Sequence, residues 1–377
     1  MIYHIINSNA FHHVPGIING ILMNAEQTNT GGKKEHFFFL RVLNFSIYTC
    51  ETNKYTLKIY IDLFIQQNID NYKFIYKDID LVLALFRLSH NDQLILHDSQ
   101  SLWRHPTLFW LLLFFKGNKF RKRVSFILWG VTEKKLRTKN FIHGLLISIN
   151  DTVFKSFKSI ITLTIDDEKK MKDWYGLTNT LVTNYILAKP LNFTEFIKPI
   201  PKKTEPVVIM VSHSSHPHNK QIEVFEMLER YKDENIQILC PVSYGDASYR
   251  IAIIDTGKKV FGNKFIYIDE LLSRDEYHKM LATVDIYISN ASVQTGLYGI
   301  HVCMFSGKKL FLKDNNLNEV KSIGVYAENI EKINSMNYQE FSKPLEDIDR
   351  ERNIQLGAER QKHLKDQYIR DWQKIYK

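Results

Sequence analysis

The chain has 377 residues, 44% of them hydrophobic and 13% aromatic, so it can bury sizeable cores and is not a disordered protein. This length is too great for one ordinary core and predicts two domains of about 150 to 200 residues each. The formal net charge of +9 indicates an anionic partner, which could be nucleic acid, an acidic lipid surface or a phosphorylated substrate.

The cysteines and the apolar runs argue against several further classes of protein. The three cysteines, Cys50, Cys240 and Cys303, lie far apart without a CxxC pair, which argues against a disulfide framework or a zinc site. Residues 1–9 read as a strand rather than a signal peptide, and the apolar run 108–115 is shorter than the roughly 20 residues of a membrane span. We therefore expect a cytoplasmic protein without a transmembrane helix.

In the first half of the chain, short β-rich runs alternate with segments of helical period, which is typical of parallel βαβ units. The expected strands are residues 3–6, 36–40, 57–61, 94–97, 124–129, 160–163 and 181–185.

Residues 188–206 hold four of the nine prolines and predict an interdomain linker. The alternation then restarts, and a capping box at Ser273 and Glu276 marks one helix start. The charge-rich tail predicts a terminal helix or helix pair that packs back on the first domain. The second set of expected strands is 207–211, 236–239, 265–268, 286–289 and 310–312. The predicted parts are a first α/β domain at 1–188, a linker at 189–206, a second α/β domain at 207–343 and a helical segment at 344–377.

This pattern predicts an α/β protein of two Rossmann-like, doubly wound parallel-sheet domains that face a cleft. In the second domain, residues 285–312 read as a strand, a polar turn, a helix and another strand. A helix start at this point would aim its free N–H groups at an anion, such as the diphosphate that leaves during glycosyl transfer. The alternative is an ordinary turn in which Ser292 or Thr295 only caps the helix. The expected diphosphate-binding residues are Ser292, Gln294, Thr295 and Gly296.

Two more loops follow strands of the second domain. The loop 211–220 contains Ser214, Asn219 and three histidines, for which we expect contacts to substrate or phosphate rather than to a metal, because their spacing does not suit one helix face. Tyr244, in the next loop, could stack on a base or sugar or simply pack on the surface.

The first domain supplies the expected acceptor side. Deprotonation of an acceptor hydroxyl requires a carboxylate or imidazole within hydrogen-bond reach. The candidate catalytic residues are His13, Asp98 and Glu133, and the candidate acceptor-binding residues are His12, His97, Trp129 and Gly130. His12 is also available as a base.

The chain also contains two acidic pairs and one basic cluster. Asp78 with Asp80 and Asp347 with Asp349 lie in helical patterns, so we expect no metal and no cofactor beyond the nucleotide sugar as co-substrate. Residues 116–123, KGNKFRKR, follow the apolar run 108–115. This combination suits either contact with an anionic membrane surface or a buried helix with a basic C-terminus.

The order of several short pieces resembles the bacterial TDP-N-acetylfucosamine:lipid II N-acetylfucosaminyltransferases, which act in enterobacterial common antigen assembly and transfer 4-acetamido-4,6-dideoxygalactose. The resemblance implies a GT-B fold, a dTDP-sugar held by the second domain, an undecaprenyl-diphosphate-linked acceptor and peripheral attachment to the inner membrane. The matching pieces are His12, His13, His97, residues 106–113, Trp129, Gly130, Ser214, Asn219, Ile222, Pro241, Tyr244, Asp275, Tyr277, Leu281, Asp285, Gln294, Gly296 and Gly307.

The chain also departs from related patterns. Where that family tends to have an acidic residue soon after Trp-Gly, this chain has Val131 and Thr132 before Glu133. The two spaced glutamates of the large retaining GT-B families fall near Gln294 and Val302.

The sequence allows two other functions besides that of a transferase acting on a lipid-linked or surface glycan. The first is a GT-B sialyltransferase-like enzyme that uses a CMP-sugar, for which His216 and Pro217 in a second-domain loop would suit the donor phosphate. The second is a non-catalytic, basic α/β binding protein. Nucleic acid is not expected as the partner, because the basic residues are scattered rather than concentrated along one groove.

Overall fold

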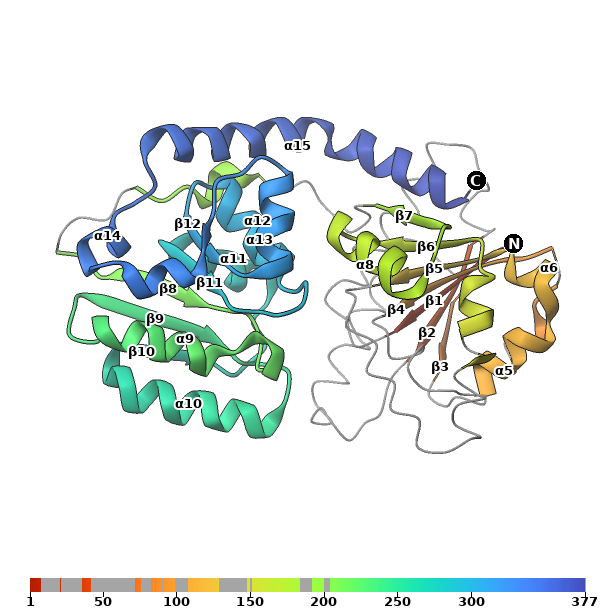
Figure 1. Cartoon of the computed structure of the whole chain (residues 1–377), viewed down its shortest axis with the longest axis horizontal. Coiled ribbons are helices and arrows are strands. Elements are labelled where there is room, and N and C mark those ends of the chain that lie inside the picture. The colour runs from red at the N-terminus through yellow and green to blue at the C-terminus, as the bar shows by residue number, and fades with distance from the viewer. Residues whose placement is uncertain are drawn as a thin grey trace. The chain divides into compact units, whose positions relative to one another are not determined.

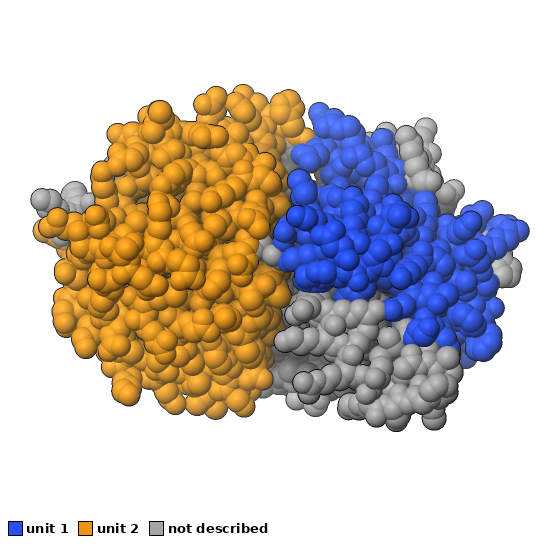
Figure 2. All heavy atoms as spheres, in the orientation of Figure 1, with its two compact units in different colours: residues 1–190, 365–377 blue, residues 191–364 orange. Residues whose placement is uncertain are grey.

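The computed structural model describes most of the second half of the chain and parts of the first. The described residues are 1–7, 21, 36–41, 72–75, 83, 85–89, 91–98, 108–128, 148–149, 151–183, 192–199 and 204–376. The chain divides into two compact units, of which unit 1 comprises residues 1–190 and 365–377 and unit 2 comprises residues 191–364 (Figure 2).

Unit 1 contains a seven-stranded sheet in the order β3-β2-β1-β4-β5-β6-β7, and its strands pair in parallel. The order reverses beside β1, so this sheet is doubly wound. Among its helices are α5 (Leu108–Phe115), α6 (Gly117–Arg121) and α8 (Ile165–Tyr175). The strands are β1 (Ile2–Asn7), β2 (His36–Arg41), β3 (Tyr72–Ile75), β4 (Gln93–Asp98), β5 (Val124–Leu128), β6 (Ser159–Thr162) and β7 (Thr180–Val182).

Six of the strands expected in this half are confirmed to within a few residues, and β3 is a strand that sequence reasoning missed. The expected strand 57–61 and the pair Asp78 and Asp80 lie outside the described residues. Strand β3 has a lysine among its four residues, YKFI, and this short run shows little alternation.

Helix α5 packs against the sheet through Trp110, which is fully buried and stacks on Phe157 with ring centroids 5.9 Å apart. Arg121 of the basic cluster is also buried, and its guanidinium donates to the carbonyl of Phe114 at 2.7 Å and to Ser156 Oγ at 2.6 Å. The end of α5 is therefore stabilised by a buried cation, because a positive charge interacts favourably with the negative end of the helix dipole. Phe115 nevertheless remains 78% exposed.

Unit 2 contains a six-stranded parallel sheet in the order β10-β9-β8-β11-β12-β13. The order reverses between β8 and β11. Helices α9 and α10 cover one face, and α11, α12 and α13 cover the other (Figure 1). The strands are β8 (Val207–Val211), β9 (Ile236–Pro241), β10 (Phe265–Ile268), β11 (Ile286–Ser289), β12 (Lys309–Leu312) and β13 (Glu328–Asn329). The helices are α9 (Gln221–Leu228), α10 (Ala247–Phe261), α11 (Arg274–Thr283), α12 (Leu297–Phe305), α13 (Asp314–Ser322), α14 (Tyr338–Ser342) and the first part of α15 (Asp347–Tyr376).

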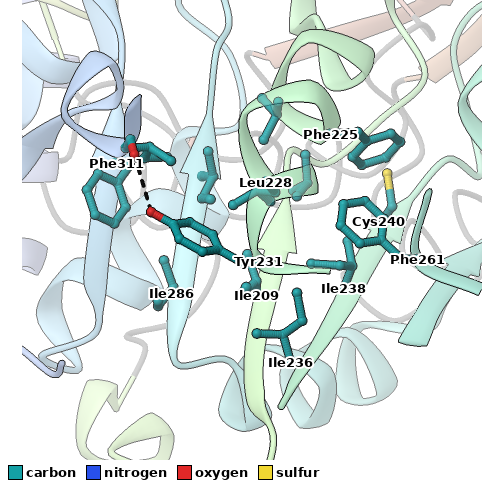
Figure 3. Close-up of a cluster of buried hydrophobic side chains, with 14 of the residues drawn as sticks. Ile209, Phe225, Leu228, Tyr231, Ile236, Ile238, Cys240, Phe261, Ile286 and Phe311 are labelled. Carbon is teal, nitrogen blue, oxygen red and sulfur yellow. Dashed lines mark hydrogen bonds between the residues drawn. The ribbon is translucent and has the colours of Figure 1, made fainter. Parts of the chain in front are cut away.

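The five strands expected in this half are confirmed, and the two-residue strand β13 was missed because a pair that short has no readable alternation. The capping box of Ser273 and Glu276 is also confirmed at the start of α11. Buried β-branched and aromatic side chains form the core (Figure 3), where Tyr231 stacks on Phe341 and donates its hydroxyl to the carbonyl of Met336 at 2.6 Å.

The chain ends in one helix, α15, of 30 residues rather than a helix pair. Its last part belongs to unit 1, where Trp372 is fully buried and Gln93 Nε2 donates to the carbonyl of Ile375 at 3.2 Å. Its earlier part belongs to unit 2 and approaches α12 at Gly357, where a Cβ would lie 2.6 Å from Phe305 Cβ.

Among the described residues, every helix is either too short or too polar to pass through a bilayer.

Candidate functional site

The strand-order reversal of unit 2 brings three loops together at the carboxyl edge of the sheet. In open α/β sheets, ligands bind at this position, because the loops on its two sides diverge and leave a crevice. The loop after β8 meets the loop after β9 through a bridge between Ser215 and Gly245, in which the Ser215 N–H donates to the Tyr244 carbonyl at 2.8 Å. It meets the loop after β11 where the Ser292 N–H donates to the His218 carbonyl at 3.2 Å.

Two predicted binding residues, Ser214 and Asn219, shape the loop after β8 from inside. Both are fully buried, and Asn219 Nδ2 donates to the Ser214 carbonyl and to Ser214 Oγ, each at 2.9 Å. Gln221 Nε2 donates to the same carbonyl. These bonds fix the curvature of the loop, so Ser214 and Asn219 position the backbone at the site.

The loop after β11 is held by a buried asparagine, Asn316, from α13. Asn316 Oδ1 accepts from the Thr295 N–H at 3.3 Å, and Asn316 Nδ2 donates to the Thr295 carbonyl at 3.1 Å and to Ser289 Oγ at 3.3 Å. Thr295 Oγ1 lies 3.0 Å from His213 Nε2, so the two loops beside the reversal are joined through side chains as well.

Gly296 sets the geometry at the start of α12. Its φ is +68°, in the left-handed region, and a Cβ there would lie 2.7 Å from His213 Nδ1. Only glycine allows this close approach without strain. Gly296 is also the N-cap residue, and no side chain caps this helix, so neither Ser292 nor Thr295 acts as the ordinary cap that the alternative required.

The first turn of α12 therefore presents N–H groups and the positive end of the helix dipole without a capping side chain and without an acidic residue. Two buried amide oxygens beside it, Gln294 Oε1 and Asn290 Oδ1, have no hydrogen-bond partner among the described residues. Ser292 is exposed on the same loop. The arrangement can bind an anion at the helix start and hydroxyl donors at the two amide oxygens.

Aromatic rings cover the other side of this edge. The rings of His216 and His218 are stacked at 5.2 Å, and Tyr244 lies 6.1 Å from His216 and 6.2 Å from His213. Burial lowers the pKa of His218 to about 4 and also lowers the pKa of His216, which Asp246 partly opposes. Both rings are therefore neutral at pH 7. Tyr244 is half-buried and packs against histidines rather than on an open surface.

No group of three or more histidine, cysteine or acidic side chains among the described residues is arranged to hold a metal ion.

The predicted residues of the first domain are placed only in part. His12, His13, Trp129, Gly130 and Glu133 lie outside the described residues. Asp98 is the last residue of β4, at the carboxyl edge of the unit 1 sheet.

His97 lies within β4 and not in a loop after it. Its side chain is fully buried, and its Nε2 lies 3.3 Å from Nδ1 of His4, which is also buried. The Trp372 ring packs 6.1 Å from the His97 ring. In this structure His97 is therefore a core residue that supports the end of α15.

The burial of His97 predicts acid sensitivity. Burial lowers its pKa to about 3, whereas an unfolded histidine has a pKa of about 6.5. The unfolded state thus binds more protons, so stability is complete above pH 6.5 and is lost as the pH falls toward 3, by about 1.4 kcal/mol per pH unit for this group. We expect His97→Leu to flatten the decline in unfolding free energy between pH 6.5 and 5. The exposed His363→Gln serves as control, and an unchanged slope in His97→Leu would contradict the assignment.

Sequence reasoning missed three polar residues at the unit 2 edge. Asn290 directly follows the 286–289 strand, and this position at a strand end could have identified it. Glu223, which accepts from Asn290 Nδ2 at 3.0 Å, and Asn316 lie inside helices. Their spacing along the chain carries no signal of the site.

No protein-family model matches the chain, and no curated protein sequence does. Solved structures do match. The E. coli trehalose-6-phosphate protein bound with UDP-2-fluoro glucose is 12% identical, with a TM-score of 0.62, and the match covers 100% of this chain and 97% of that one. The alpha,alpha-trehalose 6-phosphate synthase of Burkholderia multivorans is 10% identical, with a TM-score of 0.62 and coverage of 100% and 98%. A glycosyltransferase of Rickettsia africae is 11% identical, with a TM-score of 0.60 and coverage of 100% and 97%.

At this level of identity the likeness shows the fold. The chain has the GT-B fold of two parallel-sheet α/β units, and this part of the sequence-based expectation is confirmed.

Proposed function

We propose that the chain is a glycosyltransferase that takes a sugar from a nucleotide-sugar donor bound at the carboxyl edge of the unit 2 sheet. The observation that carries this proposal is the start of α12, which lies at the strand-order reversal without a capping side chain and beside the amide oxygen of Gln294. In glycosyl transfer, negative charge builds on the leaving nucleoside diphosphate, and first-turn N–H groups stabilise such charge. A protein of the same fold, from E. coli, was solved with UDP-2-fluoro glucose bound.

The neighbouring side chains suit the rest of such a donor. Buried amide oxygens of Gln294 and Asn290 can accept hydrogen bonds from sugar hydroxyls. The neutral rings of His216 and His218 offer flat apolar faces for a nucleobase. We propose that protein groups alone stabilise the leaving diphosphate, with no metal ion and no cofactor other than the co-substrate.

The finer identity of the reaction follows from the family resemblance. We propose a dTDP-linked deoxy or acetamido sugar as donor, and a lipid-linked or cell-surface glycan as acceptor, with His13, Asp98 or Glu133 as the base. In this proposal the enzyme works in the bacterial cytoplasm, at the inner face of the plasma membrane. The exposed ring of Phe115 next to the basic segment 116–123 supports contact with an anionic membrane.

A CMP-sugar is the second candidate donor. It is favoured by the loop of His216 and Pro217, which follows β8 directly and lies beside the site. A thermal-shift panel of dTDP-, UDP- and CMP-sugars separates the two, because a bound donor stabilises the native state according to its affinity and concentration.

Removal of the Gln294 amide is expected to weaken donor binding while the fold stays intact. Loss of one neutral hydrogen bond to a sugar hydroxyl costs about 0.5 to 1.5 kcal/mol, so Gln294→Ala should lower affinity about 2- to 10-fold. Isothermal calorimetry with the donor chosen by the panel measures this. The control is Gln339→Ala, an exposed position on α14. Equal affinities of Gln294→Ala and the wild type would refute the proposed donor site.

A further inference from the structure

A small pocket lies at the opposite edge of the unit 2 sheet, where the strands begin. It is lined by the first residues of β11 and β12, by Lys198 and Pro199, by residues 342–345 and by Arg350 of α15. Because all strands of this sheet run in parallel, this edge is the one farthest from the loops of the candidate donor site. Nothing in the proposed function uses it.

Positive charge dominates the lining of this pocket. Asp285 is the single carboxylate among the described residues that line it. Asp285 accepts from Lys198 Nζ at 2.8 Å and from the Val208 N–H at 2.9 Å, so its charge is already matched by one lysine. Lys343 is exposed and pairs with Glu346. The five cationic side chains that line the pocket are Lys198, Lys308, Lys309, Lys343 and Arg350.

Two of these lysines are buried, with exposed fractions of 4% for Lys308 and 8% for Lys309. Burial is the main reason why the pKa of Lys309 is lowered to about 8; Glu328 and Glu340 oppose the shift, and the charges of Lys343 and Lys332 add to it. Burial also lowers the pKa of Lys308; Cys303 and Asp285 oppose this shift, and Lys198 and Arg350 add to it. Burial is the main cause in both lysines, so these cations have lost hydration, and a negative charge placed beside them would be attracted with little screening by water.

Hydrogen-bond donors remain available in the pocket. Lys309 uses all three N–H groups on the carbonyls of Glu340, Phe341 and Lys343, each at 2.9 Å, and so contributes charge alone. Lys308 uses two, on the carbonyls of Ala282 and Val284, and its third N–H has no partner within the described part of the chain.

Arg350 keeps more donors than Lys308. Among the described residues, only one of its five N–H groups has a partner, the Lys198 carbonyl at 3.1 Å. Gly307 lets the Arg350 side chain pack closely, because a Cβ there would lie 2.8 Å from Arg350 Cγ.

We propose that this pocket binds a phosphate-class oxyanion, either as inorganic phosphate or as the phosphoryl group of a larger molecule. The guanidinium of Arg350 and the third N–H of Lys308 would donate to its oxygens, and the other lysines would supply attraction. The site goes beyond the proposed transferase function, since it lies at the other edge of the sheet and requires no sugar. The pocket lies between Lys198, which is near the start of unit 2, and Arg350 of α15, which is near the end of unit 2. A bound anion would therefore link the two ends of this unit.

Titration with inorganic phosphate at constant ionic strength tests the proposal, with calorimetry and thermal unfolding as readouts. We expect saturable binding that raises the melting temperature of the wild type and that weakens about tenfold or more in Arg350→Gln. Lys343→Gln, at the exposed rim, should weaken binding less and provides a second variant if Arg350→Gln fails to fold. Arg352→Gln, two residues further along α15 and exposed, is the matched control and should bind like the wild type.

Three results would overturn the proposal: no saturable binding, unchanged affinity in Arg350→Gln and Lys343→Gln, or loss of phosphate binding in Asn316→Ala, which would place the anion at the donor site instead. A phosphorylated sugar and vesicles containing an anionic phospholipid, compared with free phosphate, distinguish a small metabolite from a lipid headgroup as the source of the phosphoryl group. Failure of the transferase proposal would show in nucleotide-sugar binding, which this titration does not measure.

Discussion

Gly245→Ala is expected to disrupt the candidate donor site more than any other single-methyl change. Gly245 has a φ of +124°, which L side chains rarely adopt. A Cβ there would lie 2.6 Å from the Ser215 carbonyl carbon and 2.8 Å from the His216 nitrogen. These are backbone atoms, so they cannot rotate away, and the loops after β8 and β9 must separate.

Separation would break the hydrogen bonds between the loops, including the Asp246 N–H to the Ser215 carbonyl at 3.1 Å. With backbone strain of about 1 to 3 kcal/mol and two lost bonds of about 1 kcal/mol each, we expect a loss of roughly 3 to 5 kcal/mol in unfolding free energy. Donor affinity should fall at least about 100-fold, because the loop after β8 would no longer hold Ser214 and His213 in place.

Denaturant unfolding and donor calorimetry measure both effects. Gly262→Ala is the matched control, because Gly262 also has a positive φ, of +57°, but nothing lies within 4 Å of its added Cβ. It should cost only the backbone strain of about 1 to 3 kcal/mol and leave donor binding unchanged. Equal losses in the two variants would show that the contact between the loops does not matter.

Asn316→Ala is the second change with a large expected effect. Asn316 is fully buried and satisfies both the N–H and the carbonyl of Thr295, one residue before the cap of α12. Alanine would leave these groups without partners, at about 1 to 3 kcal/mol for each buried group. We expect a loss of roughly 2 to 6 kcal/mol in stability and a fall of about tenfold or more in donor affinity, because the start of α12 would no longer be oriented.

Asn353→Ala separates these two effects. Asn353 is also fully buried and lies away from the site. Its Oδ1 accepts from the Tyr326 N–H at 2.9 Å, and its Nδ2 donates to the Tyr326 carbonyl at 3.1 Å, as Asn316 does with Thr295. It should destabilise the protein about as much as Asn316→Ala does and leave donor affinity intact. Asn316→Asp should retain part of the stability but bind donor poorly, since its carboxylate would repel the diphosphate. Donor affinities that fall equally in Asn316→Ala and Asn353→Ala would assign Asn316 a structural role alone.

Sequence reasoning predicted most of the architecture because the strands and helices depend on neighbouring residues. Runs such as VVIMV at Val207–Val211 and IYIS at Ile286–Ser289 carry their strand signal within a few positions. The capping box of Ser273 is likewise complete within four residues. In a parallel sheet, ligands bind at the loops that follow the strands. This rule predicted Ser214, Gln294 and Gly296 as site residues.

Only the tertiary structure decided what these side chains do. His97 follows three apolar residues and reads as a strand-end ligand, yet it is buried against His4 and Trp372, which come from the two ends of the chain. Asn316 and Gly245 matter through contacts with Thr295 and Ser215, respectively, and no local pattern encodes such pairs. The physical reason is that periodicity is set by backbone geometry over a few residues, whereas hydrogen bonds, close approaches and charge clusters depend on where distant segments meet.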